Sequence, residues 1–224
     1  MNRHDIAGMH VMCSSSTNPG RITYILYPVD ILGSWIDSAA LRYDTTIVVV
    51  TGMRWLDDLT PWPAKGQPKG SSPFKGLAPG FLEKLRDELI PDTEKRLGCD
   101  CSVVRDLVGV SLSGLFATWQ WVICDIFRSI ACLSASLWYE GFTTWLNIRD
   151  IPPKQGMAYF LLGNKESKTR VKAFKSIATD TQLVLKRLDK FGIDTVFESV
   201  QGNHYDGMIS RLDKAFTALY IKHE

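Results

Sequence analysis

A serine in a short turn has the surroundings expected of a catalytic nucleophile. The segment Gly109 to Gly114 (GVSLSG) directly follows a short apolar run and opens an apolar helix that we expect to begin at Leu112. A serine at such a strand-to-helix turn has a strained backbone, and only small residues fit two positions before and two after it. Gly109 and Ser113 meet that requirement, although glycine is more usual at the second position. Ser111 is therefore the candidate nucleophile, and a turn that only caps a helix is the alternative.

A serine nucleophile needs a base, because its hydroxyl is scarcely ionised at neutral pH. Histidine is the usual base, and the chain has 4 histidines. His204 lies in a turn after the last predicted strand and before a C-terminal helix, whereas His4 and His10 precede the first predicted strand and His223 is the penultimate residue. His204 is therefore the candidate base, and the alternative is a surface histidine in a loop.

A third residue, an acid, is expected to orient the histidine. In the strand-turn-helix arrangement around such a serine, the chain order is serine, acid, histidine. The strand that we predict at Met157 to Leu162 is followed by Gly163-Asn164-Lys165-Glu166, so Glu166 is the candidate acid. Because lysines surround it, an exposed charged turn with an ordinary ion pair is the alternative. Asp180, Asp206 or a serine-histidine pair without an acid also stay open.

Two backbone N–H groups are needed to stabilise the oxyanion of a tetrahedral intermediate. The residue after the nucleophile, Leu112, is expected to supply one. The second is expected from Val29 or Asp30, in the loop after the first predicted strand, because Pro28 has no N–H to donate.

Apolar runs rich in β-formers alternate along the chain with amphipathic segments such as Pro79 to Leu97 and Val171 to Phe191. This alternation predicts an α/β domain with a mostly parallel central sheet of about six to seven strands and helices on both faces. Residues 1–224 are expected to form one domain, with catalytic groups at the carboxyl ends of the strands. The predicted strands are Ile22 to Tyr27, Thr45 to Val50, Asp106 to Val110, Ser129 to Ala135, Met157 to Leu162 and Asp194 to Val200.

Two segments, Arg54 to Ala78 and Leu137 to Lys154, interrupt the alternation. The first is rich in proline, lysine, glycine and serine, and the second in aromatic residues and proline. Because each follows a predicted strand, we expect both to be loops that overhang the site and contact substrate.

Composition excludes several classes of protein. A net charge of +2, from 26 basic and 24 acidic residues, does not indicate a nucleic-acid partner. The N-terminus has no secretory apolar core, and no run of apolar residues is long enough to span a membrane, so we expect a cytoplasmic protein. The odd, scattered cysteines are expected to be reduced thiols, and no metal or cofactor is expected. They are Cys13, Cys99, Cys101, Cys124 and Cys132.

Motifs along most of the chain resemble an esterase family of α/β hydrolases that includes enterochelin (ferric siderophore) esterases. The motifs occur in the family's order and spacing: Arg54 to Pro61 (RWLDDLTP), Phe81 to Pro91 (FLEKLRDELIP), Gly109 to Phe116 (GVSLSGLF) and Ser134 to Trp138 (SASLW). The resemblance implies the α/β-hydrolase fold and matches Ser111, His204 and Glu166 to the family's nucleophile, base and acid. Because the chain is short at its N-terminus, we expect it to lack the family's leading antiparallel strands.

The activity that these residues imply is hydrolysis of carboxylic esters through an acyl-enzyme, with a small-molecule ester as partner. The resemblance suggests a siderophore-type or other polar, aromatic ester, for which Arg54, Trp55, Trp138 and Tyr139 would form a cationic and aromatic wall, unless these aromatics pack in the core. Feruloyl or acetyl sugar esterases, thioesterases and acyltransferases use the same machinery. Tyr27-Pro28 replaces the family's glycine-containing oxyanion loop, which leaves a catalytically silent binding protein as a second hypothesis.

Overall fold

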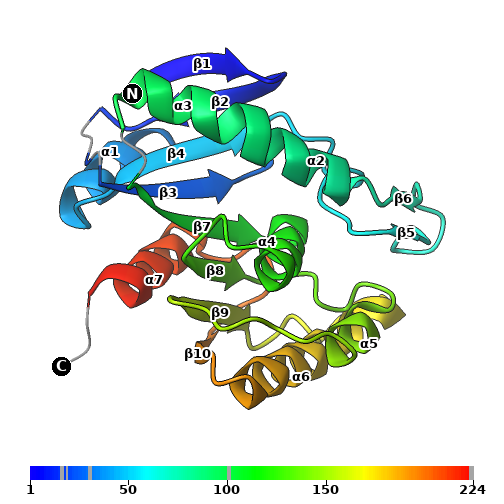
Figure 1. Cartoon of the computed structure of the whole chain (residues 1–224). Coiled ribbons are helices and arrows are strands. Elements are labelled where there is room, and N and C mark those ends of the chain that lie inside the picture. The colour runs from blue at the N-terminus through cyan, green and yellow to red at the C-terminus, as the bar shows by residue number, and fades with distance from the viewer. Residues whose placement is uncertain (16–17, 19, 30–31, 100–101, 222–224) are drawn as a thin grey trace.

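A computed structural model describes residues 1–15, 18, 20–29, 32–99 and 102–221 of the chain. Its centre is an eight-stranded sheet with the order β1-β2-β4-β3-β7-β8-β9-β10 (Figure 1). From β4 to β10 all neighbours pair in parallel, as predicted. The strands are β1 (Asn2–Ile6), β2 (Met9–Cys13), β3 (Arg21–Leu26), β4 (Thr46–Thr51), β7 (Val104–Val110), β8 (Ser129–Leu133), β9 (Met157–Gly163) and β10 (Asp194–Val200).

The expected loss of the leading antiparallel strands is wrong. β1 and β2 form an antiparallel hairpin, and β2 continues the sheet by pairing antiparallel with β4. The hairpin turns at Ala7 and Gly8, which both have positive φ, as a two-residue hairpin turn requires. These strands are short, and in β1 only Ile6 is buried, so they lack the continuous apolar run by which the other strands were recognised. They account for the larger strand number.

Helices cover both faces of the sheet (Figure 1). On one face α1 (Gly33–Arg42) and α7 (Met208–Tyr220) pack against alternate strand residues such as Val49 and Val108. The opposite face is covered by α2 (Ala78–Lys84), the π-helical turn η1 (Leu85–Leu89), α3 (Ile90–Leu97), α4 (Leu112–Ile123) and α6 (Ile177–Lys190), which follows the 3₁₀ turn η2 (Lys172–Ser176). Burial on both faces explains why β4, β8 and β9 are rich in apolar residues, whereas the edge strand β10 has no buried residue.

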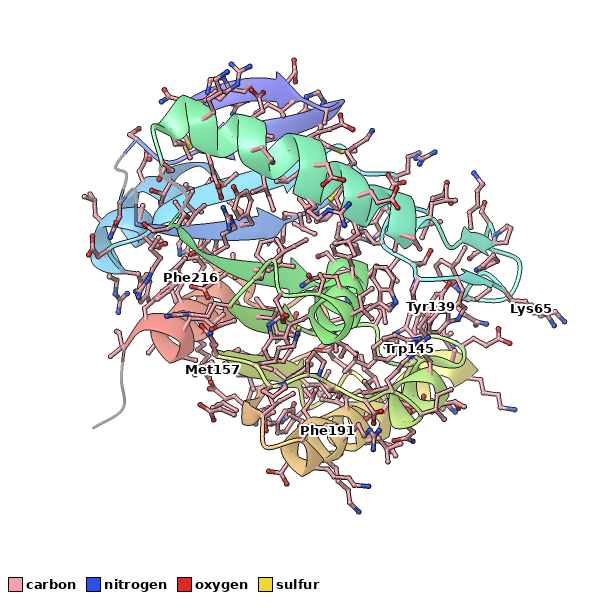
Figure 2. All side chains as sticks on the ribbon, in the orientation of Figure 1. Lys65, Tyr139, Trp145, Met157, Phe191 and Phe216 are labelled. Atoms are coloured by element: carbon pink, nitrogen blue, oxygen red, sulfur yellow. The ribbon has the colours of Figure 1, made fainter. Side chains whose placement is uncertain are left out.

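The two segments that interrupt the alternation pack on each other. One contains the small hairpin of β5 (Pro63–Ala64) and β6 (Phe74–Lys75), and the other contains α5 (Phe142–Asn147). Trp62 contacts Tyr139, Phe142 and Trp145, and its indole N–H donates to the carbonyl of Glu140. Figure 2 shows Tyr139 and Trp145 together at the end of the molecule that carries β5 and β6. The aromatic residues therefore join the two loops into one unit beside the carboxyl ends of the strands.

No helix within the described part of the chain is both long and apolar enough to cross a membrane.

Candidate active site

Ser111 lies between the end of β7 and the start of α4 with φ 57° and ψ −118°. Such a positive φ is strained for a residue with a side chain, and the turn persists because its neighbours leave it room. A Cβ on Gly109 would lie 2.2 Å from the carbonyl oxygen of Ser113, and one on Gly114 would lie 2.8 Å from the Cβ of Ala135. The chain therefore needs glycine at both positions to present Ser111 at the edge of the sheet.

Ser113, which stands where glycine is usual, has a structural use for its hydroxyl. The side chain is fully buried, and its Oγ accepts a hydrogen bond from the Val110 N–H at 2.7 Å. Its proton has the carbonyl oxygens of Leu26 at 2.7 Å and Val110 at 2.9 Å within reach. Ser113 thus ties the turn that contains Ser111 to the end of β3. This departure from the glycine pattern preserves the turn.

His204 and Glu166, far apart in the sequence, meet beside this turn. Glu166 lies in the turn after β9, and His204 lies in the turn after β10, so the parallel pairing of the two strands brings both turns to one edge. His204 Nδ1 is 2.8 Å from Glu166 Oε2. The Glu166 side chain is 2% exposed and that of His204 28%. A buried carboxylate therefore orients an imidazole that solvent and substrate can reach.

The second oxygen of Glu166 is surrounded by donors. Oε1 accepts hydrogen bonds from Ser134 Oγ at 2.6 Å, the Gly163 N–H at 2.7 Å and Arg211 Nη1 at 3.0 Å. Burial raises the pKa of the Glu166 carboxyl, but the hydrogen bonds from His204, Ser134, Gly163 and Arg211 outweigh burial, so the pKa lies below its ordinary value. Glu166 is held as an anion.

The other acids considered from the sequence have different surroundings. Asp206 Oδ2 accepts the Asn203 N–H at 2.8 Å and so closes the turn that contains His204. Asp180 lies in the first turn of α6, where burial raises its pKa and a hydrogen bond with Ser176 opposes that rise. Neither contacts the imidazole in the described structure, so Glu166 is the acid that the structure brings to His204.

Ser111 and His204 line the same pocket, which has a volume of about 470 Å³. The hydroxyl of Ser111 lies 3.3 Å from that of Ser136, whose N–H also donates to the Ser111 carbonyl. The pocket wall has both apolar and cationic side chains. It includes Trp138, Val171, Phe174, Ile177, Lys165 and Lys168.

Of the residues predicted to bind substrate, the structure brings Trp138 into this pocket, where its ring lies 4.4 Å from that of Phe174. Tyr139 is 2% exposed, and its hydroxyl donates to the carbonyl of Trp62, so it packs in the interior. Arg54 and Trp55 line a different depression, where Arg54 forms a bidentate pair with Asp58. These three residues are not brought to Ser111, because the packing of the two loops directs them elsewhere.

The expected oxyanion donors are only partly described. Leu112 is the first residue of α4, so its N–H has no partner within the helix. Val29 is half-exposed in the loop after β3, and the end of β3 lies beside the Ser111 turn because Leu26 pairs with Gly109. Asp30 lies outside the described residues.

The other histidines and cysteines that the structure describes do not line this pocket. His10, whose side chain is exposed, pairs with Asp5 on the β1-β2 hairpin, where His4 also lies. His223 and Cys101 fall outside the described residues. Across the part of the chain that is described, no group of histidine, cysteine and acidic side chains has the arrangement to hold a metal ion.

Sequence reasoning missed Arg211, Ser134 and Ser136. Both serines stand in the SASLW motif, which was recognised without a role for either of them. Arg211 has no signal in the sequence, since an arginine in an amphipathic helix is usually exposed, whereas this one is 2% exposed.

No family model matches the chain. In sequence, the chain is similar to YbbA of Bacillus subtilis (strain 168), an uncharacterized protein, with 24% identity over 139 residues. That match covers 61% of this chain and 56% of YbbA, so it spans little more than half the length of this relative.

Several solved structures are similar over nearly the whole chain. An IroE-like serine hydrolase from Shewanella oneidensis has a TM-score of 0.76 and 17% identity, covering 95% of this chain and 75% of that one. Siderophore hydrolase EstB from Aspergillus nidulans has a TM-score of 0.72 and 18% identity, covering 95% and 90%. The enterobactin hydrolase IroE in complex with DFP has a TM-score of 0.69 and 18% identity, covering 99% and 94%. The chain therefore has the α/β-hydrolase fold, and the resemblance predicted from the motifs extends to the structure.

Proposed function

We propose that this protein is a serine hydrolase that cleaves carboxylic esters through an acyl-enzyme on Ser111. The observation that carries the proposal is the 2.8 Å hydrogen bond between His204 and the buried Glu166, in the same pocket that Ser111 lines. A strained serine, a histidine and a buried carboxylate at the ends of three parallel strands match the parts that acyl transfer requires.

In the proposed reaction, the Ser111 hydroxyl attacks the ester carbonyl while His204 Nε2 takes its proton. Glu166, by accepting from Nδ1–H, selects the tautomer in which Nε2 is free and stabilises the imidazolium that forms. The Leu112 N–H and a donor from the loop after β3, Val29 or Asp30, would hold the oxyanion. His204 then protonates the leaving alcohol. A water, activated by the same imidazole, hydrolyses the acyl-enzyme and frees the acid.

The pocket favours a polar, aromatic ester. Trp138 and Phe174, whose rings are inclined to each other by 47°, offer aromatic surface to a ring, and Lys165 and Lys168 offer positive charge to an anionic or phenolic group. The structurally similar proteins include hydrolases of siderophores and of enterobactin, which is consistent with a siderophore-type ester. Feruloyl or acetyl sugar esters, thioesters and acyl transfer to an alcohol are the alternatives on the same machinery, and a panel of these substrates ranks them by kcat/KM.

A catalytically silent binding protein is the second candidate, and two observations favour it. The Ser111 hydroxyl hydrogen-bonds Ser136, and the loop after β3 has Tyr27-Pro28 where glycine is usual. Hydrogen bonds of a catalytic serine are often long before substrate binds, so this geometry alone does not exclude catalysis.

A fluorophosphonate probe separates the two candidates, because it labels only an activated serine. We expect labelling at Ser111 that is lost in Ser111→Ala and strongly slowed in His204→Ala, whereas His10→Ala, a matched histidine on the β1-β2 hairpin, labels as the wild type does. Because Ser111 and His204 act as a unit, the two single variants and the double variant should all lose roughly 10⁴- to 10⁶-fold in kcat. An unlabelled wild-type protein, or ester hydrolysis by Ser111→Ala within a few-fold of wild type, would overturn the proposal.

A further inference from the structure

A buried arginine stands behind the histidine and the acid. Arg211 lies in the first turn of α7, and its side chain is 3% exposed. An ion pair with Glu166, at 3.0 Å from Nη1 to Oε1, compensates its charge. Burying a guanidinium costs free energy unless the group is paired and hydrogen-bonded, so the contacts that Arg211 makes are expected to have a specific role.

The guanidinium also donates hydrogen bonds to the turn that contains His204. Nε donates to the carbonyl of Asp206 at 2.8 Å, and Nη2 donates to the carbonyl of Asn203 at 2.5 Å. These two carbonyls flank His204 in the sequence. The side chain therefore bridges both ends of the histidine turn to the carboxylate that orients the imidazole.

Neighbouring elements are shaped around this group. A Cβ on Gly163 would lie 2.8 Å from Arg211 Nη2 and 2.9 Å from Glu166 Oε1, so glycine there leaves the space that the pair occupies. Ser134, whose φ is 51°, accepts from Arg211 Nη1 and donates to Glu166 Oε1. The contacts come from the turn after β9, the loop after β8 and α7.

We propose that Arg211 is a positioning residue, which fixes the His204 turn and the Glu166 carboxylate relative to each other with one buried guanidinium. This inference rests on the proposed function, since positioning matters only if His204 acts as a base. Arg211 does not itself line the pocket, but it contacts Glu166 and Asn203, which do, so it acts through these neighbours.

The electrostatic consequence has a definite direction. The charged or titratable groups around Glu166 are His204 on the turn after β10, Arg211 on α7, Lys165 and Lys168 in its own turn, and Asp206 on the histidine turn. Replacing Arg211 by a neutral residue removes the buried cation among them. Every proton on the Glu166–His204 pair is then held more tightly, so the acid limb of kcat/KM, which reports the pair as a unit, moves to higher pH.

Three variants test this inference. Arg211→Gln should lower kcat roughly 10- to 100-fold at pH 8, raise KM little, and move the acid limb upward by on the order of one pH unit. Arg211→Lys keeps the charge but cannot make all the hydrogen bonds of the guanidinium to Glu166, Asn203 and Asp206. It should therefore leave the acid limb in place and lower kcat less than Arg211→Gln does. Arg187→Gln is the matched control, because Arg187 also donates to backbone carbonyls, those of Leu146 and Arg149, but pairs with no carboxylate there.

A titration without substrate keeps the inference separate from the function. In protein labelled with δ-¹³C glutamate, the Glu166 signal, assigned with Glu166→Gln, should show a higher pKa in Arg211→Gln than in wild type. If Arg211→Gln does not fold, the acid limb of kcat/KM is compared between the single variant Glu166→Gln and the double variant Glu166→Gln/Arg211→Gln. In the double variant the second substitution removes the cation that Glu166→Gln leaves unpaired. An acid limb and a Glu166 titration that stay in place in the neutral variants, or an equal loss of kcat in Arg187→Gln, would overturn the inference. If the Glu166 pKa rises in Arg211→Gln as expected, but Ser111 of the wild-type protein is not labelled by the fluorophosphonate probe, the proposed function alone is overturned.

Discussion

The substitution Glu166→Gln tests the acid most sharply, because the structure dictates how the new amide must lie. Oε1 of Glu166 faces three donors, from Ser134, Gly163 and Arg211, so the glutamine oxygen must take that place. The amide NH₂ is then forced against His204 Nδ1. A donor at that position favours the tautomer with the proton on Nε2, which cannot accept the serine proton.

The size of the effect follows from this forced orientation. By comparison with other triads, loss of the correct tautomer lowers kcat by up to about 10⁴-fold, which corresponds to roughly 5 kcal/mol of activation free energy. The fold should survive, because the amide oxygen keeps the three donors at Oε1. Replacing a charged acceptor beside Arg211 by a neutral one should cost about 2 kcal/mol of unfolding free energy. For a chain of this length that is a fall in Tm of roughly 4–8 °C.

The assay is steady-state hydrolysis of an aryl acetate at pH 8, with circular dichroism and thermal unfolding as checks on the fold. Asp180→Asn is the matched control, since it neutralises an acid that does not contact the imidazole and should retain activity within a few-fold. Activity of Glu166→Gln within about five-fold of wild type would refute the reasoning. A large loss in Asp180→Asn would then transfer the role to that residue.

Three further predictions concern the scaffold. In Gly109→Ala the new Cβ would lie 2.2 Å from the Ser113 carbonyl oxygen, so the free energy of unfolding should fall by about 2–3 kcal/mol. In Gly80→Ala, in α2, the new Cβ would have nothing within 4 Å, so the free energy of unfolding should rise by about 0.5–1 kcal/mol. Urea unfolding checks both variants, and equal effects would contradict the steric argument. The folded-state pKa of Glu166 lies below the ordinary value of 4.5, so its contribution to stability is complete above that pH and is lost as the pH falls through the folded pKa. The difference in unfolding free energy between wild type and Glu166→Gln should therefore shrink below about pH 4.5. A difference that stays constant down to lower pH would contradict this prediction. Burial raises the pKa of Cys13 to about 11 and that of Cys132 to about 12, so neither thiol should react with iodoacetamide at pH 8 before the protein unfolds, and mass spectrometry that finds either one alkylated in the folded protein would count against their burial.

Some of this molecule could be predicted because the signals are local. The strands β3, β4, β7, β8, β9 and β10 were recognised within a residue or two of their ends. The first five of these are largely buried runs rich in apolar residues, whereas β10 lies at the edge of the sheet and has no buried residue. The turn at Ser111 was recognised because its geometry demands small residues at fixed distances from the serine. The hairpin of β1 and β2 was missed because its strands are short, and one of them is largely exposed.

Other features could not be predicted, because they depend on which loops pack together. Tyr139 and Trp138 are adjacent and similar in type, yet Tyr139 is buried against Trp62 while Trp138 lines the pocket. Arg54 was expected beside the substrate, but the hairpin of β5 and β6 and its neighbours leave it paired with Asp58. Side chains in a loop do not follow the regular repeat of a helix or a strand, so the sequence does not show which of them point into a pocket and which into the interior.

The sequence by itself determined the order of the six parallel strands and the position of each candidate catalytic residue at the end of a strand. Parallel strands all end at one edge, so Ser111, Glu166 and His204 had to lie near one another once the sheet formed. Only the tertiary structure decided that Glu166, and not Asp180 or Asp206, contacts the imidazole, and that a buried Arg211 stands behind both. Those contacts span many residues of sequence and depend on distances of a few ångströms, which arise from the packing of α7 against the turns after β9 and β10 and leave no pattern in the chain.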